Sequence, residues 1–266
     1  MLALIAGSGA LPAAVAGAQD VLPLVCALDG HAPDGLAVDI PFRLETLGSL
    51  LADLRRRGVR QVCLCGSIRR PEIDPALIDK LTMPLIPVLH EALSAGDDGA
   101  LRAVITLFES AGFSVLAAHE AAPDLLMSVG VPTAQKPPAG TETDALAGEA
   151  ALLDMGRADL GQACVVVAGQ VVAREDDAGT DAMLARLERT PGQGQRLGVL
   201  FKGPKPGQDR RADLPTIGPG TVRAVAGAGL AGIVIEAESV IVLDRQQLLA
   251  DLDRAGLFLW SRKAGG

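Results

Sequence analysis

Apolar runs alternate with helix-like stretches along the first half of the chain. The apolar runs occupy residues 2–6, 21–28, 59–65 and 113–118. Between them, residues 45–57 and the stretch after residue 99 place apolar side chains three and four positions apart, as on one face of a helix. Buried strands that alternate with helices are typical of a parallel sheet with helices on both faces. The pattern therefore predicts a doubly wound, Rossmann-like α/β domain.

The periodicity stops at residues 130–141, which hold three prolines, and a different pattern follows. Two valine-rich runs within residues 163–173 are interrupted by Ala168 and Gly169, as in a hairpin. Further helices are expected at 142–157, 181–189 and 219–228, and further strands at 197–201 and 232–243. The sequence thus predicts a Rossmann-like nucleotide- and phosphate-binding domain at 1–130, a linker at 131–141, and a smaller mixed-sheet α/β catalytic domain at 142–266.

Composition and charge exclude several classes of protein. With 49% hydrophobic residues in 266, the chain can build two cores and is not disordered. Aromatic residues make up only 2%, which disfavours a single-strand reader that stacks bases on aromatic rings. The 24 basic and 32 acidic residues give a net charge of −8, so neither nucleic acid nor an anionic lipid surface is an expected general partner.

Cysteine usage and the N-terminal residues favour a cytoplasmic protein. The four cysteines form no C-x-x-C pair and there are only three histidines, so buried reduced thiols are expected rather than a zinc site. The apolar N-terminus has no basic residue before Arg43, unlike a secretory signal. No uninterrupted apolar run is long enough to span a membrane.

The turn after the first apolar run is a candidate anion cradle. Backbone N–H groups at the start of a helix bind anions, and here a helix-like stretch follows a glycine turn. The dinucleotide fingerprint is broken because Pro12 stands where it requires glycine. A merely tight turn is the alternative. The candidate phosphate-binding residues are Gly7, Ser8, Gly9, Ala10 and Leu11.

Two further groups in the first half carry candidate chemistry. Gly66, Ser67, Arg69 and Arg70 follow an apolar run, where open α/β sheets bind ligands and two arginines could clamp a diphosphate. A solvated arginine pair is the alternative. The adjacent carboxylates of Asp97 and Asp98 could hold Mg²⁺, although acidic residues at a helix start more often act as caps.

The loop at 202–219 combines lysines, arginines, aspartates and a glutamine with several prolines and glycines. Phosphoryl transfer requires such a mixture, because cations bind phosphate oxygens and carboxylates hold a metal or a water. A surface loop with internal salt bridges is the alternative. Upstream, Thr180 or Asp181 could cap a helix, and Asp181 could also bind a metal or a ribose. The candidate substrate-binding residues here are Thr180, Lys202, Gln208, Thr216 and Gly218.

Asp213 is the main candidate for an essential carboxylate, with Asp209 and Arg211 completing a catalytic set. On an extended segment these three side chains would share one face, so that two carboxylates flank an arginine. Asp213 would either hold Mg²⁺ or activate the attacking water. A cap or a salt bridge within the loop is the alternative. The candidate metal ligands are Asp213, Asp209, Asp181, Asp97 and Asp98.

At these motifs the sequence resembles the LpxI family of UDP-2,3-diacylglucosamine pyrophosphatases of lipid A biosynthesis. The matching segments are residues 2–12, 66–71, 96–102, 154–163, 178–186, 202–219 and 228–237. They follow one another over nearly the whole chain, and the segment Q-D-R-R-A-D-L-P-T-I-G-P is specific. One departure is Ala178, which replaces a glutamate common in the family before the glycine of G-T-D.

The resemblance implies two domains with the active site in the cleft between them. It also implies Mg²⁺-dependent hydrolysis of UDP-2,3-diacylglucosamine to UMP and 2,3-diacylglucosamine 1-phosphate (lipid X), with water attacking the phosphorus next to the sugar. A homodimer and a transient peripheral contact with the inner face of the inner membrane are left open. The alternatives are a nicotinamide-dependent oxidoreductase, against which the broken glycine fingerprint counts, and a non-catalytic module that binds UDP-linked lipids.

Overall fold

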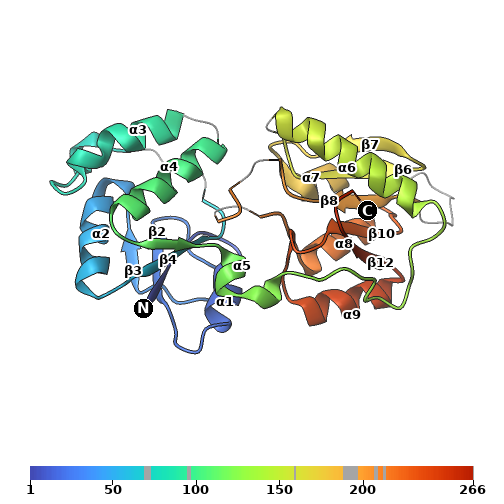
Figure 1. Cartoon of the computed structure of the whole chain (residues 1–266), viewed down its shortest axis with the longest axis horizontal. Coiled ribbons are helices and arrows are strands. Elements are labelled where there is room, and N and C mark those ends of the chain that lie inside the picture. The colour runs from blue at the N-terminus through green and yellow to red at the C-terminus, as the bar shows by residue number, and fades with distance from the viewer. Residues whose placement is uncertain are drawn as a thin grey trace. The chain divides into compact units, whose positions relative to one another are not determined.

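The computed structural model describes residues 1–68, 73–94, 97–158, 160–187, 197–206, 209–211 and 214–265. The chain divides into two compact units. The first comprises Met1–Pro123 together with Asp209–Asp213, and the second comprises Asp124–Gln208 together with Leu214–Gly266. In Figure 1 the main part of the first unit runs from blue to green, and the second runs from green to red.

The first unit is built on a parallel sheet in the order β3-β2-β1-β4-β5. The strands are β1 (Leu2–Ala6), β2 (Leu24–Leu28), β3 (Ile40–Phe42), β4 (Gln61–Cys65) and β5 (Ser114–Leu116). Strand order runs outward from β1 in one direction through β2 and β3, and in the other through β4 and β5. This reversal confirms the predicted doubly wound fold and puts its switch point between β1 and β4.

Helices cover the first sheet. They are α1 (Leu11–Gly17), α2 (Leu47–Arg56), α3 (Ile86–Ser94), α4 (Asp97–Ser110) and α5 (Ala118–Ala121). Leu54 of α2 and Phe108 of α4 share one core with Ile5 and Val62 of the sheet. The shorter helices α1 and α5 contact β1 and β4. Short 3₁₀ turns lie at Leu44–Thr46, Pro75–Leu77, Met83–Leu85 and Pro123–Leu125.

The second unit has its own sheet, in the order β12-β10-β8-β6-β7. Its strands are β6 (Ala163–Val167), β7 (Gln170–Arg174), β8 (Val199–Lys202), β10 (Gly232–Glu236) and β12 (Phe258–Arg262). The last three are parallel, while β6 and β7 are antiparallel, so the predicted mixed sheet is confirmed. The predicted hairpin turns at Ala168 and Gly169, which both have positive φ (49° and 76°), as a two-residue type I′ turn requires.

Helices lie on both faces of this second sheet. They are α6 (Thr141–Arg157), α7 (Gly179–Ala185), α8 (Pro219–Gly227) and α9 (Arg245–Ala255). Met155 of α6 packs with Phe201 and Val234, whereas Met183 of α7 packs in a separate cluster with Leu200. The strand–turn–strand expected at 232–243 differs in pairing, because β11 (Ile241–Val242) pairs with β9 (Thr216–Ile217) in a small separate sheet.

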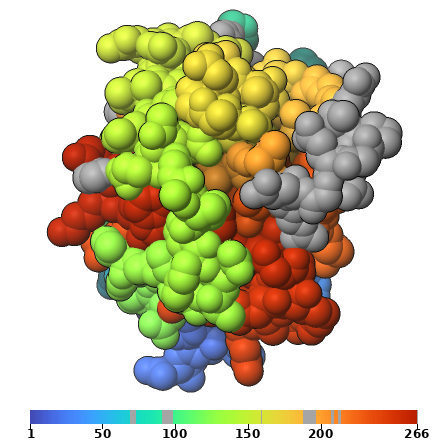
Figure 2. Space-filling model, turned by 90° about the vertical axis from the view of Figure 1, so that its right-hand side faces the viewer, coloured from blue at the N-terminus to red at the C-terminus, as the bar shows by residue number. Residues whose placement is uncertain are grey.

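The structure differs from the expected linker at 131–141, because this stretch is built into the second unit. Thr133 accepts a hydrogen bond from the backbone N–H of Leu259 (3.1 Å), and the N–H of Ala134 donates to Asp253 (2.8 Å). Just before it, Gly130 pairs with Ser261. Figure 2 shows this green segment against the red C-terminal elements. The sequence lacks periodicity here because side chains and isolated bridges satisfy the backbone, and the division between units falls after Pro123.

All four cysteines are free and buried, as the sequence predicts. Burial raises the pKa of the Cys26 and Cys164 thiols to about 12, which makes both unreactive at neutral pH. Within the described ranges, no helix has the length and apolar character needed to cross a membrane.

Candidate functional site

Two of the predicted motifs meet at the carboxyl edge of the first sheet. The backbone N–H of Gly7 donates to the carbonyl of Cys65 (2.8 Å), and Ser8 and Ser67 exchange a pair of backbone hydrogen bonds (both 2.9 Å). The loops after β1 and β4 thus continue to pair beyond the ends of their strands. This contact lies at the switch point of the sheet, where doubly wound folds bind ligands.

Two glycines make this close approach of the two loops feasible. A Cβ atom on Gly7 would lie 2.5 Å from the carbonyl oxygen of Ser67, and one on Gly66 would lie 2.6 Å from the carbonyl oxygen of Gly7. Gly66 also has a φ of +93°, which other residues rarely adopt. The glycines that the sequence singled out as phosphate-binding therefore have a structural role in joining the two loops.

The same contacts change the prediction for the anion cradle. The N–H groups of Gly7 and Ser8 are committed to Cys65 and Ser67, so they are not donors for a phosphate in this arrangement. Within the described residues, the N–H groups of Gly9, Ala10 and Leu11 have no hydrogen-bond acceptor. The candidate donors of this turn are therefore its last three residues, which lead into α1.

Arg69 and Arg70 lie outside the described residues, as do Gln208 and Asp213 in the second half of the chain. Asp97 and Asp98 are the first two residues of α4.

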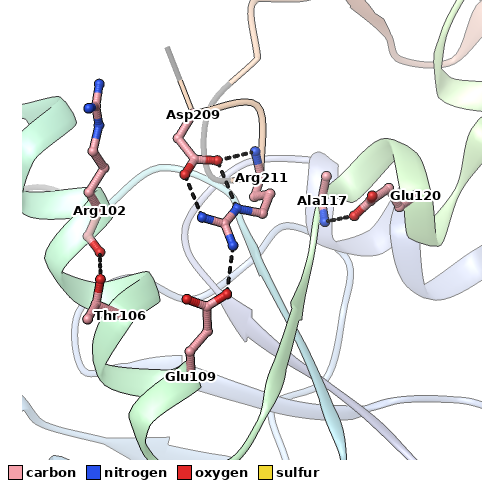
Figure 3. Close-up of polar contacts among 7 residues, drawn as sticks. All are labelled: Arg102, Thr106, Glu109, Ala117, Glu120, Asp209 and Arg211. Carbon is pink, nitrogen blue, oxygen red and sulfur yellow. Dashed lines mark hydrogen bonds and ion pairs between the residues drawn. The ribbon is translucent and has the colours of Figure 1, made fainter. Parts of the chain in front are cut away.

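The segment 209–211 belongs to the first unit although it comes from the second half of the chain. Figure 3 shows Arg211 between two carboxylates. Its Nε and Nη2 donate to Asp209 (3.0 and 2.8 Å), and its Nη1 donates to Glu109 of α4 (2.7 Å). Arg211 thus attaches this segment to α4.

The same contacts overturn the extended geometry expected for this segment. The backbone N–H of Arg211 also donates to the Asp209 carboxylate (3.0 Å), which folds the chain into a turn and brings the two side chains into contact. Hydrogen bonds from the guanidinium lower the pKa of Asp209 and raise that of Arg211. Asp209 and Arg211 therefore neutralise each other instead of facing a ligand side by side.

His119 is a member of this region that sequence reasoning did not single out. It lies in α5, three residues after the end of β5. Burial and then the positive charge of Arg210 lower its pKa, which favours the neutral imidazole. Its Nδ1 is buried without a hydrogen-bond partner among the described residues. The signal that could have found it is its place directly after an apolar strand of the parallel sheet.

In the second unit, two predicted substrate-binding residues are in contact. Lys202 is the last residue of β8 and is 9% exposed, and its Nζ donates to the hydroxyl of Thr180 on α7 (2.8 Å). The Thr180 hydroxyl in turn donates to Glu175 Oε1 (2.6 Å). Glu175 was not predicted, because nothing in the run Glu175-Asp176-Asp177 marks it out from its neighbours.

The remaining predicted residues of the second unit make only local contacts. Thr216 is in β9, and its hydroxyl donates to the carbonyl of Leu214 (3.2 Å). Gly218 precedes α8, and its N–H donates to Thr221 Oγ1 (3.2 Å). Asp181 follows Thr180 and is exposed. These contacts are those of local turns and helix starts.

The described residues do not assemble the predicted magnesium site. Across them, no three His, Cys, Asp or Glu side chains gather closely enough to hold a metal ion. Asp209 is engaged by Arg211, and Asp213 lies outside the described residues. Mg²⁺ binding therefore stays a prediction.

Comparison with known proteins gives matches in both halves of the chain. Residues 1–125 match the family model described as the LpxI N-terminal domain, and residues 128–260 match the LpxI C-terminal domain. The chain is also 37% identical over 270 residues to a protein of Caulobacter vibrioides named UDP-2,3-diacylglucosamine pyrophosphatase LpxI. That similarity covers 97% of this chain and 96% of the Caulobacter protein.

Proposed function

This chain belongs to the LpxI family, and we propose that it hydrolyses the pyrophosphate bond of UDP-2,3-diacylglucosamine. The observation that carries the proposal is the 37% identity to the Caulobacter pyrophosphatase, which extends over nearly the full length of both proteins. Both family domains are also present in order. The activity is therefore assigned to the whole chain.

The finer chemistry is part of the proposal. Water forms a bond to the phosphorus next to the sugar while the bond from that phosphorus to the bridging oxygen breaks. The bridging oxygen leaves with UMP, and the other product is 2,3-diacylglucosamine 1-phosphate, which is lipid X. The proton released from water passes to a base, for which Asp213 is the candidate.

Each unit by itself offers groups that support binding of a phosphate. The buried ammonium of Lys202 lies at the carboxyl end of β8 beside Thr180. The N–H groups of Gly9 and Ala10 are available at the carboxyl end of β1. Charged and backbone donors that are fixed before the substrate binds stabilise the negative charge that develops in phosphoryl transfer. No step of this reaction is assigned to a metal ion, and a Mg²⁺ requirement stays a prediction.

The acyl chains of the substrate require apolar surface. Within the first unit, several large apolar side chains along residues 77–88 are exposed: Leu77, Leu81, Met83 and Val88. Clustered exposed apolar side chains often mark a surface that binds lipid or protein. They support a transient contact with the inner face of the inner membrane, which the resemblance left open.

UMP release from UDP-2,3-diacylglucosamine tests the proposal directly. The full chain is incubated with the substrate in Mg²⁺ and in EDTA, and UMP and lipid X are quantified. Equal amounts of both products in Mg²⁺ are expected, with loss of turnover in EDTA. Binding of the substrate without UMP would instead identify a non-catalytic module. A fluorescence change with NAD(H) and no UMP would favour the oxidoreductase.

Substitution of Asp213 by alanine tests the proposed base. Turnover should fall at least about a hundredfold, because a catalytic carboxylate acts chiefly in the transition state, while substrate binding survives. Steady-state kinetics and a thermal melt are compared with those of D20A, which removes an exposed carboxylate of the same unit. A folded D213A protein with near-parental kcat would refute the assignment.

A further inference from the structure

A chain of three side chains links β7, α7 and β8 in the second unit. Lys202 Nζ donates to Thr180 Oγ1 (2.8 Å), and Thr180 Oγ1 donates to Glu175 Oε1 (2.6 Å). Lys202 lies at the carboxyl end of the central strand of its sheet. This is the edge at which open α/β sheets bind their ligands.

The direction of these hydrogen bonds follows from the chemistry of the three groups. An ammonium only donates and an ionised carboxylate only accepts, so the single hydroxyl proton of Thr180 must point to Glu175. A lone pair of the hydroxyl oxygen then faces Lys202. The carboxylate thus orients the hydroxyl, and the hydroxyl in turn fixes one N–H of the ammonium and the end of the flexible lysine side chain.

Glu175 itself is fixed by backbone contacts from the start of β6. Its own N–H donates to the carbonyl of Ala163 (2.9 Å), and its Oε2 accepts the N–H of Gln162 (2.6 Å). A side chain at Gly161 would overlap Cβ and Cγ of Glu175. One carboxylate oxygen is therefore held by the backbone, which leaves the other directed at Thr180.

We propose that Glu175 is a positioning residue that acts through Thr180 to hold Lys202 for an anionic oxygen of the substrate diphosphate. The inference rests on the proposed function, because it takes the diphosphate of a UDP-sugar as the ligand. Glu175 does not touch the substrate itself. Loss of the hydroxyl or of the carboxylate should weaken diphosphate binding while the fold is kept.

Thr180 provides the sharper test, because its shape and its hydroxyl can be separated. T180V keeps the branched side chain without the hydroxyl, and T180S keeps the hydroxyl. The matched control is T133V, since the hydroxyl of Thr133, a buried residue of the second unit, also donates one hydrogen bond (to Gln135 O) and accepts one (from Leu259 N). T180V should weaken UDP binding about tenfold, as expected for a lost hydrogen bond to a charged group. T180S and T133V should bind UDP like the parent.

The double variant tests whether Glu175 acts through Thr180. E175Q alone should weaken UDP binding severalfold, but E175Q in the T180V background should add little, since both changes interrupt one path. UDP affinity is measured by calorimetry on the full chain, and kcat and KM for UMP release are measured in parallel. In T180V the rise in KM should be larger than the fall in kcat. In T180S, which keeps the hydroxyl, both values should stay close to those of the parent.

The two measurements separate failure of this inference from failure of the proposed function. UDP titration does not need turnover, so it decides the inference even if the parent releases no UMP, a result that would overturn the proposed activity alone. Parental UDP affinity in T180V, full additivity of E175Q and T180V, or no UDP binding by the parent would each overturn the role of Glu175.

Discussion

At the carboxyl edge of the first sheet, Gly7 and Gly66 bring two loops into main-chain contact, whereas at the same edge of the second sheet Lys202 and Arg262 lie buried among side-chain partners. The contact at the first edge requires glycine, because a side chain at position 7 or 66 would overlap the other loop. The contacts at the second edge require the polar side-chain atoms that bind Lys202 and Arg262. The first edge should therefore be damaged by added atoms, and the second by removed ones.

At the carboxyl edge of the second sheet, Arg262 is held by contacts with several side chains. It is the last residue of β12 and is 4% exposed. Its Nη1 donates to Glu149 (3.0 Å) and its Nη2 to Glu142 (3.4 Å), both on α6. Its guanidinium also lies over the ring of Trp260, 5.5 Å from the centroid. Glu149 in turn accepts the backbone N–H of Gly265 (2.7 Å), so the arginine ties α6 to the end of the sheet.

The largest effect is expected from an added methyl group at the first edge. G7A would bring a Cβ to within 2.5 Å of the Ser67 carbonyl oxygen, a backbone atom that cannot rotate away. The two loops would have to separate, and the free energy of unfolding should fall by about 3 kcal/mol. Denaturant unfolding monitored by circular dichroism measures this difference.

Gly17, the last residue of α1, provides the matched control. A Cβ there meets no atom within 4 Å, so G17A should be neutral or stabilise the protein by up to about 1 kcal/mol. If G7A and G17A unfold at the same denaturant concentration, the main-chain contact does not limit the stability of the first edge.

At the second edge, removal of a cation should have the next largest effect. R262M keeps a long apolar side chain over Trp260 but removes the arginine that pairs with the Glu149 carboxylate. The free energy of unfolding should fall by about 2 kcal/mol, less than for a fully buried pair because Glu142 and Glu149 are partly exposed. R157M removes an exposed arginine of α6 and should change it by less than about 0.5 kcal/mol. Equal unfolding of the two variants would contradict the comparison.

The features that the sequence predicted are those with a local pattern. Apolar runs and helical spacing located most strands and helices, and glycines after β1 and β4 marked the first edge. Because parallel strands end at one edge, the two glycine motifs could be expected to lie near each other. Their direct pairing, which uses the N–H groups of Gly7 and Ser8, depends on tertiary structure and was not predictable.

Contacts between distant parts of the chain account for most of what the sequence did not predict. Arg211 and Glu109 are 102 positions apart, so no pattern in the loop at 202–219 indicated that its middle belongs with the first unit. The proline-rich stretch at 131–141 was interpreted as a linker for the same reason, since its partners Asp253 and Leu259 come more than a hundred residues later. Glu175 could not be distinguished from Asp176 and Asp177 without the position of Thr180.

The smallest effect is expected at the ion pair of Arg211 and Glu109 in the first unit. Both side chains are partly exposed (38% and 46%), so solvent screens their attraction. A double-mutant cycle of E109Q and R211M should give a coupling of about 0.5 kcal/mol in the free energy of unfolding, too little to rank with G7A or R262M.

The pH dependence separates this pair from the contact of Arg211 with Asp209. Because Arg211 lowers the pKa of Asp209, the stability that this contact provides is present above the pKa of aspartate in the unfolded chain and is lost as the pH falls through the lower folded value. The stability difference between R211M and the parent should therefore shrink below about pH 4. In E109Q the stability provided by the Asp209 contact should still be lost at low pH, since Arg211 and Asp209 remain in contact. If E109Q instead abolishes this loss of stability in acid, Arg211 is held on the first unit mainly by Glu109.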